Sequence, residues 1–192
     1  MMDGKEHSIR FINSSYDTLF CIPDGGTVEV QFPDRKFTAK CEYLDDYHTK
    51  VGDTVFHICE FAELLERQNG TVRPEPETEL DKAAWQLAHR EYLMVERTEG
   101  GFRYELLTQQ FKSVVQGQID SADWTMNHAR EHILETLNMS HRNRAAVPFD
   151  EVSGKAKAAS RSVLQELNGL QSQQAPAARV GMEKTHGGKE IR

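Results

Sequence analysis

The chain has 192 residues, a formal net charge of −7 and a hydrophobic content of 38%. That length suits one domain or two small ones that share a core, and the composition predicts a modest core with solvated segments appended. No apolar run is long enough to cross a membrane, and the start, MMDGKEHSIR, lacks the apolar stretch of a secretory signal, so we expect a cytoplasmic protein without membrane contact.

Charge is distributed unevenly along the chain. Residues 1–79 carry a net charge of −8, residues 80–140 a net charge of −3, and residues 141–192 a net charge of +4. An acidic body repels the phosphates of nucleic acids and favours basic protein surfaces. We therefore expect a protein partner with a basic surface and no direct binding of nucleic acid by the acidic body.

The first part of the chain has the alternation of an antiparallel sheet. Four short runs predict strands, separated by turns at PDGG and PDRK: SIRFIN (8–13), TLFCI (18–22), TVEVQF (27–32) and FTAKCEYL (37–44). The next segment, DDYHTKVGD at residues 45–53, is polar and is predicted to be a connection.

A helix is predicted after this connection. Apolar residues at helical spacing share one face: Val55, Ile58, Ala62 and Leu65. Asp53 or Thr54 is placed to cap its start, and Asn69-Gly70 ends it. Residues 72–79, VRPEPETE, are predicted to be an extended acidic connector because their prolines do not continue a helix.

The second part repeats the order of strands followed by a helix. We predict a short helix at 81–90, strands at 91–98, 102–107 and 112–119, and a helix at 121–139. This order predicts an α+β fold, in which helices pack on one face of an antiparallel sheet. Residues 1–140 then form one α+β domain of two halves, 1–70 and 80–140, joined by the acidic connector.

Residues 141–170 are predicted to be a helical extension. Its apolar residues keep a spacing of three or four: Val152, Ala156, Ala159, Val163, Leu167 and Leu170. The polar face of this amphipathic helix, residues 151–168, carries Lys155, Lys157 and Arg161. Residues 171–192 show no apolar pattern and are predicted to be a disordered tail.

The stretch HAREH, residues 128–132, has the H-x-x-E-H order of inverted zinc metallopeptidases. In such enzymes two histidines one turn apart hold zinc and the glutamate polarises its water. Here the helix is apolar along Ala122, Met126, Ala129, Ile133 and Leu137, and the histidines lie about 150° and 110° from the centre of that stripe. We therefore interpret HAREH as a solvated helix face, with a zinc hydrolase using His128, Glu131 and His132 as a remote alternative.

Other features also argue against catalysis. The sequence has no nucleophile elbow, phosphate-binding glycine loop or dinucleotide fingerprint, so we expect no enzyme activity and no cofactor. Cys21, Cys41 and Cys59 are predicted to be three buried thiols. A zinc site from Cys41, Cys59 and the nearby His48 and His57 is the alternative, although these spacings lack the paired ligands of a zinc knuckle.

Acidic side chains recur through the loop, helix and connector of the first half. An array of carboxylates can occupy a basic nucleic-acid channel with its charges in the place of phosphates, and aromatic side chains can anchor such an interface. The alternative is an ordinary solvated face. The candidate partner-binding residues are Asp45, Asp46, Glu60, Glu63, Glu66, Glu75, Glu77, Glu79, Tyr43, Tyr47 and Trp85.

Three segments, LFCIPDGG, CEYLDDYHTKVGDTVFHICEFAELLER and VRPEPE, resemble a family of small acidic accessory proteins. These are encoded on conjugative transposons and phages of gut bacteria, and they are related to large-polyvalent-protein-associated and YodL-like domains. The likeness covers about residues 8–120, and residues 141–192 show none. It implies a bacterial mobile element as the setting and carries no catalytic residues over to this chain.

In that setting small acidic proteins often disarm host defence. The resemblance and the acidic body together lead to a first hypothesis, an anti-CRISPR inhibitor that binds an RNA-guided nuclease or its guide complex. A second hypothesis is an adaptor of conjugation or plasmid replication, in which the helix at 151–168 docks on a relaxase or a helicase. The sequence predicts no oligomeric state.

Overall fold

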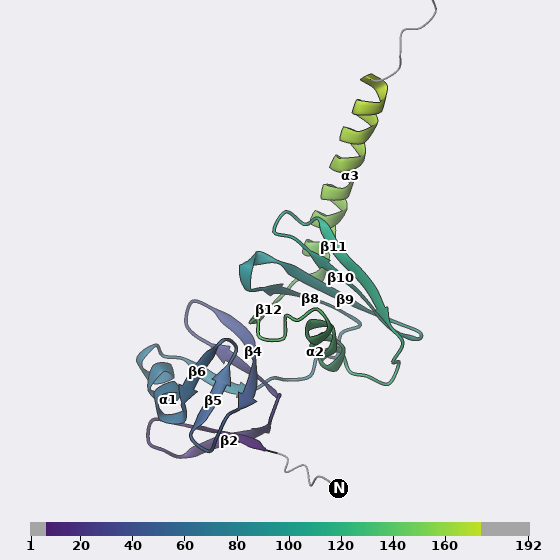
Figure 1. Ribbon diagram of the computed structural model, residues 1–192. Coiled ribbons are helices and arrows are strands. Elements are labelled where there is room, and N and C mark those ends of the chain that lie inside the picture. Colours follow the sequence, from purple (N-terminus) through teal and green to yellow (C-terminus); the bar gives the residue numbers. More distant parts are fainter. Residues whose placement is uncertain (1–6, 174–192) are drawn as a thin grey trace, which may run out of the picture.

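The computed structural model describes residues 7–173. Figure 1 shows two halves side by side, with a long helix that projects from the second half. The N-terminal half contains β1 (Ser8–Ile12), β2 (Thr18–Pro23), β3 (Thr27–Gln31), β4 (Lys36–Tyr43), β5 (His48–Val51), β6 (Thr54–His57), α1 (Ile58–Arg67) and β7 (Thr71–Pro74). The C-terminal half contains β8 (Lys82–Leu87), a 3₁₀ turn η1 (Ala88–Arg90), β9 (Tyr92–Thr98), β10 (Gly101–Leu107), β11 (Ser113–Ile119), α2 (Met126–Thr136), β12 (Arg144–Val147) and α3 (Phe149–Gln173).

Both halves share one antiparallel sheet. Its order is β11-β10-β9-β8-β12-β4-β3-β7, with β5 and β6 attached beside β4, and β1 and β2 form a separate hairpin. The expected α+β class with an antiparallel sheet is therefore confirmed. None of the helices within residues 7–173 is long and apolar enough to cross a membrane.

The core of the N-terminal half lies between the β1–β2 hairpin, the β3–β4 strands and α1. Val28 and Val30 alternate inward from β3, and Phe61 and Leu65 reach them from the buried side of α1. Phe11 of β1 contacts the ring of Phe61 edge to face, with ring centroids 5.8 Å apart. These contacts fix α1 against the hairpin and leave its other side to solvent.

The core of the C-terminal half is built on both faces of β8–β10. Trp85 and Leu87 face α2, whose Ile133 and Leu134 are almost fully buried. Ala84, which alternates to the other face, packs with Val152 from the first turns of α3. The two helices thus cover opposite faces of the same strands, and the distal part of α3 extends beyond the sheet (Figure 1).

The two halves meet at β12. This strand pairs with β8 over four residues but with β4 at one position, where Arg144 lies opposite Thr38. Because this sheet connection is so short, side chains at the junction carry much of the contact between the halves.

Several sequence-based boundaries are wrong in the N-terminal half. The polar segment 45–53 contains β5 and turns at Gly52 into β6, so it is a hairpin instead of a connection. Val55 belongs to β6 and is 54% exposed. The helix begins at Ile58, where His57 caps it: Nδ1 of His57 accepts from Cys59 N–H at 3.2 Å. The predicted end at Asn69-Gly70 agrees with the structure.

The second half also departs from prediction in four places. Residues 82–87 form β8 instead of a helix, because a strand lets Ala83 and Ala84 pack on opposite faces. Residues 144–147, assigned to a helical extension, form the strand β12. The helix α2 is shorter than 121–139, and α3 begins earlier than 151 and continues to Gln173. From residue 174 on, the predicted tail lies outside the described residues.

Candidate protein-binding surface

The loop between β4 and β5 is ordered by its own side chains. Oδ1 of Asp45 accepts hydrogen bonds from the backbone N–H groups of Tyr47 and His48, both at 2.8 Å, and lies 3.0 Å from Nδ1 of His48. These bonds, the one from Tyr47 N–H most of all, hold the pKa of Asp45 below its ordinary value. The hydroxyl of Tyr43 donates to Asp46 at 2.7 Å, and this bond raises the pKa of Tyr43. The loop therefore holds the carboxylates of Asp45 and Asp46 in fixed positions.

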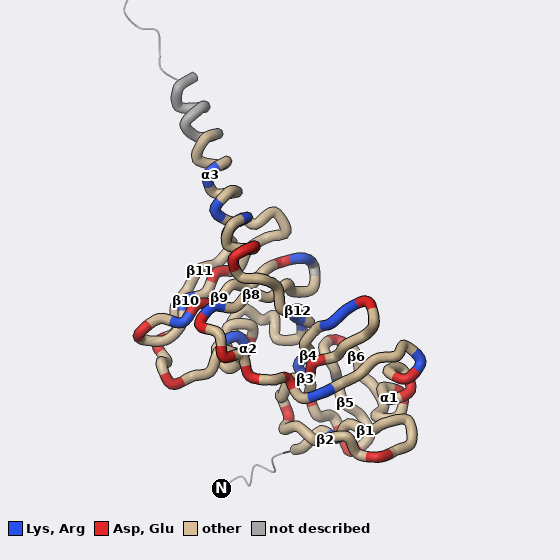
Figure 2. Tube along the Cα trace, turned by 180° about the vertical axis from the view of Figure 1, so that it is seen from behind, with Lys and Arg blue, Asp and Glu red and all other residues tan. Residues whose placement is uncertain are grey.

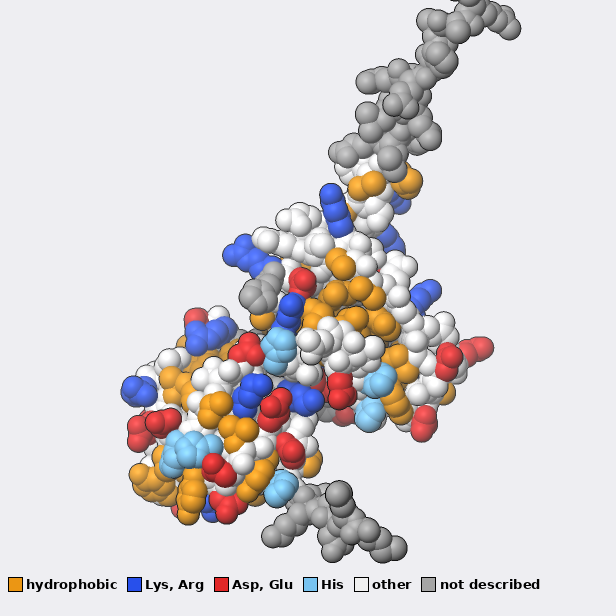
Figure 3. Space-filling model, in the orientation of Figure 1, with side chains coloured by type: hydrophobic (Ala, Val, Ile, Leu, Met, Phe, Trp, Pro, Cys, Tyr) orange, Lys and Arg blue, Asp and Glu red, His pale blue; other side chains and the backbone are white. Residues whose placement is uncertain are grey.

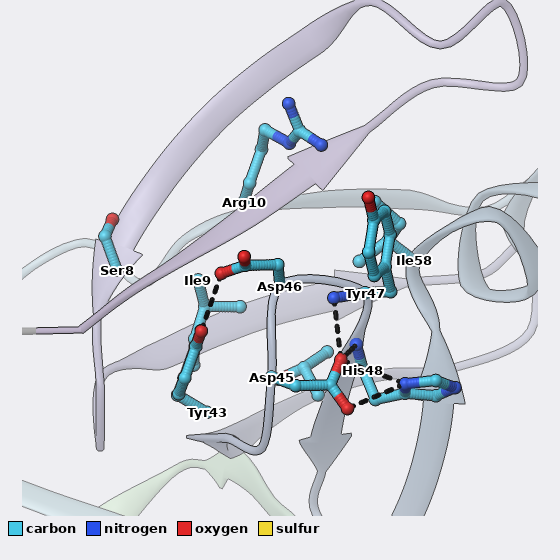
Figure 4. A pocket seen from close by; sticks show the side chains of 10 residues that line it. Ser8, Ile9, Arg10, Tyr43, Asp45, Asp46, Tyr47, His48 and Ile58 are labelled. Atoms are coloured by element: carbon cyan, nitrogen blue, oxygen red, sulfur yellow. Dashed lines mark hydrogen bonds and ion pairs between the residues drawn. The ribbon is translucent and has the colours of Figure 1, made fainter.

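A depression of about 360 Å³ lies beside this loop. Figure 4 shows Arg10, from β1, on one side of it and Tyr47 and Asp46 facing it from the loop. The residues that line it are Ser8, Ile9, Arg10, Tyr43, Asp45, Asp46, Tyr47, His48, Thr49 and Ile58. Its walls are mainly polar, and Tyr47 is 60% exposed, so the depression suits a polar or charged group from a partner surface.

The helix α1 continues this surface. The backbone N–H of Ile58 donates to the carbonyl of Tyr47 at 2.9 Å, and the Tyr47 ring stacks on that of His57 with centroids 6.1 Å apart. These contacts join the loop to the start of α1. The exposed side of α1 then carries Glu60, Glu63 and Glu66. We call Asp45, Asp46, Tyr47, Glu60, Glu63 and Glu66 the loop–α1 surface.

Of the other predicted residues, Tyr43 lines the depression beside this surface, and the four that remain lie elsewhere. Glu77 and Glu79 are exposed on the connector next to α2, where Glu77 accepts a hydrogen bond from Asn127 N–H at 3.1 Å. In Figures 1 and 2 this region is well separated from α1. Trp85 is 3% exposed inside the C-terminal core, and the Glu75 side chain is 8% exposed. The predicted acidic array is thus split, and neither Trp85 nor Glu75 is available as a surface contact.

Most of the residues that line the depression were not predicted from the sequence. Ser8 and Arg10 line it although they lie on β1, far from the loop in sequence, and Thr49 lines it from β5. The pairing of β4 with β5 places Tyr43 opposite Thr49, and only that register brings them together. The strand at residues 48–51 was predicted to be a connection, so this contact could not be foreseen from the sequence.

A buried charge cluster lies where the two halves meet. Arg130 and Arg144 have fully buried side chains, and Glu131 lies between their guanidinium groups. Arg130 Nε donates to Glu131 at 2.7 Å, and its two terminal nitrogens each donate to Glu75 at 2.6 Å. Two arginines and two glutamates therefore balance their charges inside the protein, as buried ions require.

Glu75 ties this cluster to the N-terminal half. Its carboxylate also accepts from the hydroxyl groups of Thr27 at 2.8 Å and Thr38 at 3.1 Å, which lie on β3 and β4. The cluster was not foreseen, but one signal exists: Arg130 lies four residues after Met126 and four before Leu134, on the apolar side of its helix. An arginine at such a position needs a buried carboxylate.

Protonation of Glu75 at low pH should lower the stability of the protein. Burial by itself would raise its pKa, but the hydrogen bonds and charge of Arg130 hold the pKa below its ordinary value of 4.5. A carboxyl whose pKa is lowered on folding contributes stability above the unfolded-state pKa and loses it as the pH falls. We expect the free energy of unfolding to fall below about pH 4.5, less steeply in Glu75→Gln than in wild type, as measured by urea unfolding between pH 3 and 7. Equal slopes for the two proteins would contradict this.

The side chains of the stretch HAREH point to two different environments. His128 and His132 are exposed, as predicted, and their rings pack on Trp124 with centroids 4.4 and 4.9 Å away. The expectation that Glu131 faces solvent beside them is wrong, because Glu131 turns inward to Arg130 and Arg144. Glu131 therefore belongs to the buried charge cluster, whereas His128 and His132 lie at the surface.

The cysteines occupy three different environments. Cys41 is buried, and burial raises its thiol pKa to about 12. Cys59 is half-buried, and Cys21 is exposed, so the prediction of three buried thiols is wrong for Cys21. The rings of His48 and His57 lie 5.2 Å apart. Among residues 7–88 and 90–165, whose side chains the structure describes, no group of three or more His, Cys, Asp or Glu residues is arranged to hold a metal ion.

Comparison with known proteins gives one match. The family model described as large polyvalent protein-associated domain 16 matches residues 78–168, from the connector through β12 into the projecting part of α3. The match shares residues 78–120 with the resemblance drawn from the sequence and extends it to residue 168, whereas the loop–α1 surface lies outside it. Neither the curated proteins nor the solved structures that were compared gave a match. Residues 78–168 are therefore similar to large polyvalent protein-associated domain 16, which supports a protein associated with phages or mobile elements.

Proposed function

We propose that the protein is a non-enzymatic interaction protein of a bacterial mobile element that binds a basic nucleic-acid-binding protein through the loop–α1 surface. Its most concrete form is a counter-defence inhibitor, an anti-CRISPR protein that binds an RNA-guided nuclease with its guide and blocks DNA engagement. The observation that carries the proposal is the ordered loop–α1 surface, with five exposed carboxylates around the exposed Tyr47. The match at residues 78–168 supports the setting.

The electrostatics of the surface favour this partner. Within the described chain, no lysine or arginine forms an ion pair with Glu60, Glu63 or Glu66. Carboxylates that are ionised and lack a cation attract arginine and lysine groups that otherwise bind phosphates. Because Asp45 and Asp46 are held by hydrogen bonds, they lose little conformational freedom on binding.

A matched pair of variants tests the surface. Glu63→Gln with Glu66→Gln removes two charges whose carboxylates make no hydrogen bond in the described chain, and Asp45 and Glu60 stay because they order the loop and the helix start. We expect the Kd for a purified guide-loaded RNA-guided nuclease to rise about tenfold in the double variant. The measurement is biolayer interferometry from 50 to 300 mM salt, where wild-type affinity should fall steeply.

The control removes equal charge elsewhere. Glu99→Gln with Glu135→Gln changes two exposed acids in the C-terminal half and should leave the Kd within about twofold of wild type. An equal loss in both variants would show that net charge acts and the loop–α1 surface does not. The proposal fails if no basic nucleic-acid-binding partner binds at all.

A second candidate function is an adaptor that binds a relaxase or helicase through α3. Its basis is the part of α3 beyond the sheet, where Val163 is 39% and Leu164 is 60% exposed. Deleting everything after Met139 would not test it, because β12 and the buried Arg144 would be lost as well. Val163→Ser with Leu164→Ser leaves the body intact, and an adaptor should lose binding in that variant while the inhibitor should not.

A further inference from the structure

The two ends of the shared sheet differ in how their edges are protected. At one end, β7 has four residues and includes Arg73 and Pro74, which are features that block pairing with another strand. At the other end, β11 has seven residues, SVVQGQI, without a charge or a proline. Its hydrogen-bonded neighbour is β10, and no described element pairs with its outer edge. An edge of this length and composition is a template for another strand.

The residues on either side of β11 are oppositely charged. Lys112 precedes the strand and Asp120 follows it, both exposed, and Gln116 lies midway between them. Neither Lys112 nor Asp120 forms an ion pair with another described residue, while Asp120 accepts a hydrogen bond from Gln118 at 2.9 Å. The strand is therefore neutral with a cation at its start and an anion at its end.

We propose that the β11 edge pairs with β11 of a second copy of this chain, antiparallel, about a two-fold axis at Gln116. In that register Lys112 of each copy lies opposite Asp120 of the other, so both ends gain an ion pair. Side chains that point to one face of β11 then lie opposite side chains that point to the same face in the second copy. The two sheets therefore join into one continuous sheet.

The side chains next to the edge suit the same register. Tyr104 lies over Gly117: a Cβ there would come within 2.4 Å of the Tyr104 hydroxyl oxygen, so any larger residue would force the Tyr104 ring to shift. The pairing brings Val115 of the second copy opposite Gly117 and beside the Tyr104 ring. Tyr104 and Val115 are only partly buried in the single chain. Figure 3 shows hydrophobic side chains gathered on this face of the C-terminal half, near α2 and below α3.

Shifted registers lose these matches. Moving the axis to Val115 places Lys112 opposite Gln118, and moving it to Gly117 places Asp120 opposite Val114. Of these three axes, only the one at Gln116 places both Lys112 and Asp120 opposite a residue of opposite charge. This charge complementarity is what selects a second copy over an unrelated strand.

A charge swap on the full chain tests the proposal. We expect a dimer by sedimentation equilibrium and a rise of tenfold or more in its dissociation constant for Lys112→Glu and for Asp120→Lys, because each places like charges opposite one another twice. The double variant should restore the wild-type constant within about threefold. Since Lys112 and Asp120 lie at opposite ends of one strand, such rescue must come from contact between copies. Thermal unfolding shows whether each variant folds.

Cross-linking tests the axis itself. In a Cys21→Ser background, Gln116→Cys should form a disulfide-linked dimer, because residues opposite each other in antiparallel strands have Cα atoms about 4.5–5.5 Å apart. Gln118→Cys should not, since the two copies of residue 118 would be about 13 Å apart. A monomer at all concentrations, a double variant as weak as the single ones, or equal cross-linking at 116 and 118 would overturn the proposal.

Discussion

Replacing Glu131 by glutamine is expected to lower the free energy of unfolding by about 3 kcal/mol. The substitution keeps the shape of the side chain but removes the carboxylate that Arg144 contacts, and the Arg144 side chain is fully buried. A buried guanidinium without its counter-charge costs far more than a lost surface ion pair. Urea unfolding of the two proteins at pH 7 measures the difference.

The same helix offers a matched control. Glu135 is exposed one turn after Glu131 and forms no ion pair with any residue that the structure describes, so Glu135→Gln should change the free energy of unfolding by less than about 0.5 kcal/mol. If Glu131→Gln were as stable as Glu135→Gln, the buried Arg144 would not depend on Glu131 for its counter-charge.

Truncating Phe102 to alanine should cost about 3–5 kcal/mol of stability. Phe102 is fully buried between the sheet and α2, and the Arg97 guanidinium lies 4.6 Å from its ring centroid. The loss of transfer free energy and the cavity left under α2 act together. Chemical denaturation followed by circular dichroism gives the value.

A control for packing lies on the neighbouring strand. Val114 of β11 is 55% exposed, so Val114→Ala removes methyl groups that are largely in water already. Its expected cost is below about 1 kcal/mol. A small cost for Phe102→Ala, equal to that of Val114→Ala, would mean that α2 closes over the missing ring or does not pack there.

The strands that alternate cleanly were predictable from sequence. TVEVQF and FRYELL each place apolar side chains on one face, and both are strands in the structure, as β3 and β10. Their period is set by the chain itself and needs no knowledge of the neighbours. For the same reason the α+β class followed from the order of elements.

Elements whose conformation depends on their neighbours were not predictable. KAAWQL has good helix formers, yet it is the strand β8 because α2 and α3 cover its two faces. RAAV is too short to show a period, and it becomes β12 because Arg144 has a buried carboxylate to meet. In both cases the tertiary contacts outweigh local propensity.

The candidate surface was partly predictable. Asp45, Asp46 and the acids of α1 come from one continuous stretch, so sequence proximity was enough to group them. Glu75 and Trp85 were grouped with them by sequence as well, but their burial depends on contacts with α2 and β12. Burial of single residues in a connector or a strand cannot be read from composition.

Competition with DNA would show whether the loop–α1 surface occupies the DNA-binding channel of the nuclease. A guide-loaded RNA-guided nuclease is immobilised, saturated with this protein and then offered target DNA carrying a fluorophore. We expect DNA binding to fall as the protein is added, with Glu63→Gln/Glu66→Gln requiring about tenfold more protein than wild type. A ternary complex, in which protein and target DNA bind the nuclease together at full affinity, would contradict the idea that the loop–α1 surface takes the place of phosphates.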